Sequence, residues 1–110
     1  MEEEIQQKVE QLQNIEQNLQ HISLQRQTIH SQLTEIDTAL DALKTETKKT
    51  FKIIGAVMIE STKEEITKDL KSKRELLEVK EKSFEKRENK LKESIKEIQE
   101  EVIKKMEKNG

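Results

Sequence analysis

This chain of 110 residues has too little apolar material for a compact globule of its length, since 31% of its residues are hydrophobic and 40% are charged. Its net charge of −2, with Lys and Glu interleaved, provides no basic field for a nucleic-acid backbone. The longest apolar run, at 53–59, is far shorter than the roughly 20 residues that span a bilayer. We therefore expect no nucleic acid and no membrane as partners. An acidic start unlike a targeting peptide, together with the absence of Cys, favours a cytoplasmic location.

The first half of the chain places apolar residues at steps of three and four, the spacing of a coiled-coil seam. Pro is absent and Gly occurs twice, so little interrupts a helix. The pattern predicts a helix over residues 3–48, with Arg26 as the polar member of its seam. The seam consists of Ile5, Leu12, Ile15, Leu19, Ile22, Arg26, Ile29, Leu33, Ile36, Leu40 and Leu43.

The segment 50–60 differs from both halves because it is rich in β-branched residues. Gly55 stands where a two-residue hairpin loop requires a positive φ. These features predict a short β-hairpin. The alternative is a helix that continues through Gly55, because one Gly in a helix costs only about 1 kcal/mol.

A second helix is expected over residues 62–108. Ser-Thr-Lys-Glu at 61–64 fits a capping box, in which the Ser61 hydroxyl accepts a hydrogen bond from a backbone amide and Glu64 reaches back. One column of this helix is apolar at every heptad, whereas the companion column is largely polar before its last two members. The apolar column is Leu70, Leu77, Phe84, Leu91 and Ile98, and the companion column is Thr67, Arg74, Glu81, Glu88, Ile95 and Val102.

Folding the chain about Gly55 makes the two helices antiparallel, so residues whose numbers add to a constant lie at the same height. One constant aligns the two leucine-rich columns along the chain. The same constant sets Arg26 opposite Phe84, which predicts a cation-π pair. In the other layers, residues such as Glu88 are expected to cover an Ile with their stems while their charged groups reach water.

The hairpin would expose apolar side chains on both faces, and an isolated two-stranded hairpin is at best marginally stable. The fold class that follows is mainly α: a long antiparallel two-helix coiled coil with a short β-hairpin that assembles with other hairpins into an oligomeric β-barrel. Ile53 and Val57 are expected at paired strand positions. The predicted oligomer interface is Phe51, Ile53, Ile54, Val57, Met58 and Ile59.

Nothing in the sequence indicates an enzyme, a cofactor or a metal site. His21 and His30 are the two histidines, and their spacing puts them on nearly opposite sides of a helix. An elongated pair of helices has no core that could desolvate a carboxylate or hydroxyl and shift its pKa.

The free end of the helical pair carries more apolar residues than a fraying terminus can cover, which indicates a binding surface for varied partners. The alternative is a tightly closed end with no surplus apolar surface. The candidate residues are Ile5, Val9, Leu12, Ile95, Ile98, Val102, Ile103 and Met106.

Four segments together resemble the beta class of the prefoldin family: Gln-Arg-Gln-Thr at 25–28, Thr-Ala-Leu-Asp-Ala-Leu at 38–43, Phe-Lys-Ile-Ile-Gly at 51–55 and Val-Met-Ile at 57–59. The resemblance covers nearly the whole chain as a single domain, 1–110. It implies a jellyfish-shaped hexamer of two alpha-class and four beta-class subunits whose hairpins form the barrel. It also implies an ATP-independent chaperone, a holdase, that binds unfolded proteins at the coiled-coil tips and delivers them to a group II chaperonin.

A structural or tethering coiled coil that recruits partner helices is the rival function. In that case the segment 50–60 is merely a loop, and deleting it leaves the oligomeric state unchanged. Deletion from a chaperone subunit should instead leave a helical monomer or dimer.

Overall fold

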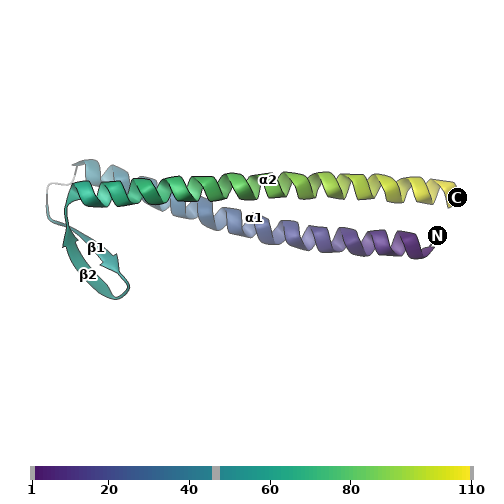
Figure 1. Ribbon diagram of the computed structural model, residues 1–110, viewed down its shortest axis with the longest axis horizontal. Helices are drawn as coiled ribbons and strands as arrows, with labels where there is room; N and C mark the ends of the chain where they lie inside the picture. Colours follow the sequence, from purple (N-terminus) through teal and green to yellow (C-terminus); the bar gives the residue numbers. More distant parts are fainter. Residues whose placement is uncertain (1, 46–47, 110) are drawn as a thin grey trace. The chain divides into compact units, whose positions relative to one another are not determined.

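The computed structural model describes residues 2–45 and 48–109, in the order helix, hairpin, helix (Figure 1). Helix α1 spans Glu2–Thr45, strands β1 and β2 span Thr50–Ile54 and Val57–Ser61, and helix α2 spans Lys63–Asn109. This is the expected fold of two long helices joined by a short antiparallel hairpin. The continuous helix through Gly55 is therefore wrong.

Helix α1 ends three residues before the expected boundary at Lys48. Glu46 and Thr47 lie outside the described residues, and Lys48 and Lys49 have no helical conformation. The amine of Lys63, from the first turn of α2, donates a hydrogen bond to the backbone carbonyl of Lys44 at 3.2 Å. A cation at this position satisfies a carbonyl that the last turn of a helix leaves unpaired.

The hairpin turns at Gly55 and Ala56. Gly55 has a φ of 60° and Ala56 does not have a positive φ, a combination that a two-residue type II′ loop requires. The strand register pairs Ile53 with Met58 and Ile54 with Val57. The expectation that Ile53 opposes Val57 was wrong by one residue, which places these two side chains on different faces of the hairpin.

The start of α2 is capped one residue later than expected. The Thr62 hydroxyl, not that of Ser61, accepts a hydrogen bond from the Glu65 amide at 3.1 Å. The Glu65 carboxylate accepts a hydrogen bond from the Ser61 hydroxyl at 2.9 Å. Thr62 therefore replaces Ser61 as the cap of α2, and Glu65 reaches back to the Ser61 hydroxyl rather than Glu64 completing the predicted box at 61–64. Both frames fit the same run of Ser, Thr and Glu.

The structure divides into two compact units. One comprises Met1–Gln27 and Lys82–Gly110, and the other comprises Thr28–Glu81 and includes the hairpin. Each contains a stretch of α1 paired with a stretch of α2. The predicted seam positions of α1 are buried or half-buried in both units, which confirms the heptad pattern. The hydrophobic residues classed as buried among the described residues are Ile29, Leu33, Ile36, Leu77 and Ile98.

Candidate functional site

The free end of the helical pair, in the unit of Met1–Gln27 and Lys82–Gly110, contains the eight predicted binding residues, but they differ in exposure. Ile98 is buried at 6% exposure, and four others are half-buried in the seam. Val9, Ile103 and Met106 are exposed at 38%, 55% and 59%. The half-buried residues are Ile5, Leu12, Ile95 and Val102.

Two ion pairs cross between the helices at this end. The Lys8 amine lies 2.7 Å from the Glu101 carboxylate, and the Lys105 amine lies 2.9 Å from the Glu4 carboxylate. In each case a hydrogen bond from the lysine, reinforced by its charge, lowers the pKa of the carboxyl group below its ordinary value. These pairs were not predicted from the sequence, although Lys8 and Lys105 occupy positions in the seam columns and the two pairs have the same sum of residue numbers.

The seam of this unit contains an ion pair between Arg26 and the buried carboxylate of Glu88. Their closest atoms, Nη1 and Oε2, lie 3.1 Å apart, and the Glu88 side chain is only 5% exposed. The second carboxylate oxygen of Glu88, Oε1, is buried and accepts no hydrogen bond. The expectation that the charged group of Glu88 reaches water was therefore wrong, because Arg26 reaches across the seam and holds it inside.

The predicted cation-π pair between Arg26 and Phe84 was also wrong. The guanidinium over the Phe84 ring belongs to Arg87, one turn along the same helix, with 5.7 Å between its central carbon and the ring centroid. Arg26 pairs with Glu88 instead. A charged partner close to the seam attracts a guanidinium more strongly than the face of an aromatic ring does.

The hairpin is a second surface with exposed apolar groups. All six predicted interface residues are exposed, from 42% at Ile59 to 70% at Ile53. Strand pairing puts Phe51, Ile53 and Met58 on one face, while Ile54, Val57 and Ile59 lie on the other. The hairpin therefore presents apolar side chains on both of its faces.

One ion pair links the hairpin to α2. The Lys52 amine lies 3.6 Å from the carboxylate of Asp69. Lys52 shares its hairpin face with Ile54, Val57 and Ile59. This contact ties that face to the first turns of α2.

Along residues 2–45 and 48–109, no three His, Asp or Glu side chains gather as metal ligands, and neither helix combines the length and apolar character that crossing a bilayer requires.

A family model described as "Prefoldin subunit" matches residues 6–109. The chain is similar to proteins named prefoldin subunit beta from two organisms. The protein from Thermococcus kodakarensis is 34% identical over 80% of this chain and 77% of its own length. The protein from Archaeoglobus fulgidus is 31% identical over 90% of this chain and 87% of its own length.

Solved structures agree with the sequence matches. The crystal structure of the prefoldin beta subunit from Thermococcus strain KS-1 superimposes with a TM-score of 0.84 and 32% identity, over 90% of this chain and 89% of that chain. The beta2 subunit from the same strain shares the fold, with a TM-score of 0.58 and 21% identity.

Proposed function

Because the chain belongs to the prefoldin family and its relatives are beta subunits, we propose that it is one arm of an ATP-independent holdase. Family members assemble with other prefoldin subunits and are chaperone components without enzymatic activity. In this proposal two alpha-class and four beta-class subunits form a hexamer in the cytoplasm. The hexamer holds non-native polypeptide at the free ends of its arms and passes it to a group II chaperonin.

The exposed apolar side chains at the free end carry the proposal. Val9, Ile103 and Met106 are exposed, while the two ion pairs hold the helices together beside them. Contact with such side chains is non-directional, and the unbranched Met can adapt to different surfaces. A surface of this kind suits captured chains of varied sequence, and Ile98 supports it from within the seam.

The assembly part of the proposal rests on the hairpin, whose six apolar side chains are exposed in the single chain. A two-stranded sheet also leaves two edges with unpaired backbone groups. Pairing with the hairpins of other subunits covers the faces and the edges together. Alpha-class subunits and further copies of this chain are the proposed neighbours.

Assembly is tested by replacing Ile53 and Met58 with Lys, since these residues face each other across the strands. Two like charges on one buried face should dissociate the complex while the helical content stays constant. The matched control introduces the same two Lys residues at Leu76 and Val79 of α2, which are exposed at 67% and 68%. Native mass, measured with and without an alpha-class subunit, should fall in the hairpin variant alone. An unchanged mass in that variant refutes assembly through the hairpin.

Holdase function is tested by replacing Val9, Ile103 and Met106 with Ser, which leaves the buried seam intact. The variant should keep its native mass and lose most of its suppression of the aggregation of a denatured protein. Each side chain contributes at most about 1.5–3 kcal/mol when fully buried against a captured chain, and several arms multiply the effect. The control changes Leu76 and Val79 to Ser. This Ser variant of Val9, Ile103 and Met106 is called the tip variant. If it assembles correctly and still suppresses aggregation as well as the parent does, capture occurs at another surface.

A further inference from the structure

Helix α1 has an almost uncharged stretch in a highly charged protein. Between residues 11 and 27 it contains two residues of Asp, Glu, Lys or Arg, whereas the antiparallel segment 83–99 contains nine. Charged residues normally cover the surface of a soluble helix, because leaving water is costly for them. The neutral stretch can be covered by a partner at a smaller desolvation cost.

The neutral residues form a row along one flank of the helix. Val9, Gln13, Gln17, Gln20 and Leu24 follow at steps of four, four, three and four, the spacing of a single helical face. All five are exposed, with Leu24 at 60%. The row begins at Val9, an exposed apolar residue of the proposed capture surface, and ends at an exposed leucine.

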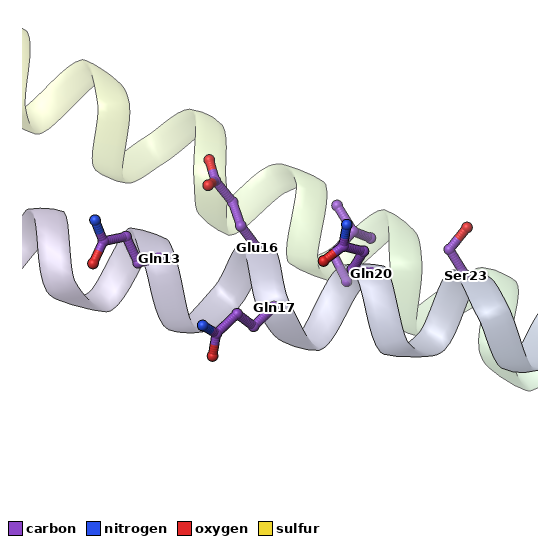
Figure 2. A pocket seen from close by; sticks show the side chains of 6 residues that line it. Gln13, Glu16, Gln17, Gln20 and Ser23 are labelled. Carbon is purple, nitrogen blue, oxygen red and sulfur yellow. The ribbon is translucent and has the colours of Figure 1, made fainter.

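A shallow groove runs along part of this row. Figure 2 shows Gln13, Gln17 and Gln20 with Glu16 and Ser23 as its polar lining, all projecting from α1. Leu19, half-buried in the seam, also lines the groove. The groove therefore combines three amide groups with one carboxylate, one hydroxyl and one apolar lining residue.

We propose that this row binds an extended, uncharged segment of non-native polypeptide with apolar residues near its two ends. The proposal rests on the holdase function and names the part of a captured chain that the arm selects. Val9 and Leu24 are 15 positions apart in the sequence, about 22 Å along a helix. An extended chain of about seven residues covers that distance.

The chemistry of the glutamine side chain identifies the occupant. Each amide group offers donors and an acceptor, the same functions that the backbone of an extended chain leaves unpaired. A helical partner has already satisfied its backbone groups and would gain less from this row. Amide contacts to a backbone do not depend on sequence, while the apolar ends fix the position of the segment.

The test uses the assembled protein and a fluorescent seven-residue peptide with Leu at both ends and Ser and Thr between them. We expect this peptide to bind more tightly than the same peptide with two central Asp residues. Replacing Gln13, Gln17 and Gln20 with Glu should lower the affinity for the neutral peptide by about tenfold and the affinity for the acidic peptide by more. Glu has nearly the helix propensity of Gln, so the fold is preserved.

The other flank of α1 supplies the matched control. Gln11, Asn14 and Asn18 are exposed there, and their replacement with Glu, Asp and Asp adds the same charge. This control should change peptide affinity by less than about twofold. The proposal is overturned if the parent binds neither peptide, if it binds both equally, or if both triple variants lose the same affinity.

Aggregation assays separate this inference from the holdase function. Normal capture of a denatured protein by the Ser variant of Val9, Ile103 and Met106 refutes capture at the tip. If the tip variant fails to capture but the glutamine variant binds the peptide normally, the holdase function stands and the selection of a segment by α1 is wrong. If the parent has a higher native mass than the Glu variant of Gln13, Gln17 and Gln20, the row binds a second copy of the chain and the proposed occupant is wrong.

Discussion

The ion pair between Arg26 and the buried Glu88 carboxylate gives the sharpest test of how the helical pair is stabilised. We consider the replacement of Arg26 by Leu, which leaves the Glu88 carboxylate in the seam without its cation. The carboxylate side chain is 5% exposed, and its Oε1 atom accepts no hydrogen bond even in the parent. The variant therefore retains a buried charge and loses the group that compensates it.

The magnitude follows from the unequal burial of the two partners. Removing one member of a buried pair costs about 3–5 kcal/mol in the free energy of unfolding. The Arg26 side chain is 41% exposed, so water can reach this layer and the cost should lie at about 3 kcal/mol or below. Replacing Glu88 alone should cost less, because the long Arg26 side chain can turn its charge to solvent.

The double replacement of Arg26 and Glu88 by Leu should restore the free energy of unfolding to at least that of the parent, and up to about 1 kcal/mol above it, because an apolar layer then continues the seam. The assay is urea unfolding followed by circular dichroism at fixed protein concentration, with native mass checked for each variant. Arg87→Leu is the control and should cost at most about 1 kcal/mol, the contribution of its contact with Phe84. If Arg26→Leu costs no more than this control, the carboxylate is not held in the way described.

Three further predictions concern the cap, the turn and the free end. Thr62→Ala should lower the free energy of unfolding by about 1 kcal/mol in urea titrations, because it removes the hydroxyl that caps α2. Gly55→Ala should cost about 1–2 kcal/mol in the same titrations, purely from its φ of 60°, since a Cβ there meets no atom within 4 Å. Hydrogen bonds and charge from their lysine partners lower the pKa values of Glu4 and Glu101 from the ordinary 4.5. The stabilisation of the folded state by these two ion pairs is therefore present above pH 4.5 and is lost as the pH falls through the lowered pKa. The protection of amides near both carboxylates, measured as the observed exchange rate relative to the intrinsic rate at each pH, should therefore fall at acidic pH. Protection that is higher at acidic than at neutral pH would contradict this sign.

Much of the fold could be predicted because one strong periodic signal runs through each helix. The steps of three and four in α1 determine which residues enter the seam, and Gly55 has one structural role that fits its place between two β-branched runs. The antiparallel alignment then follows from the position of the turn. These features depend on patterns of many residues, so a single exception such as Arg26 does not disturb them.

The details that were wrong depend on choices between near-equivalent neighbours. Ser61 and Thr62 can both cap a helix, and the register of a hairpin changes when a turn moves by one residue. The partner of Arg26 depends on how far its side chain reaches, since both Phe84 and Glu88 lie close to its layer. The glutamine row of α1 was overlooked because uncharged polar residues produce no hydrophobic periodicity.

The distribution of buried residues relates these local features to function. Among the residues that the structure describes, five hydrophobic side chains are buried, and four of them belong to the unit that contains the hairpin: Ile29, Leu33, Ile36 and Leu77. The unit with the free end has Ile98 as its buried hydrophobic residue and places the charged Glu88 in its seam. Local opening free energies are lower where fewer apolar contacts are buried. Under the proposed function, the better-packed unit with the hairpin would serve assembly, and the unit with the free end would open its seam more easily and expose further apolar side chains to a captured chain.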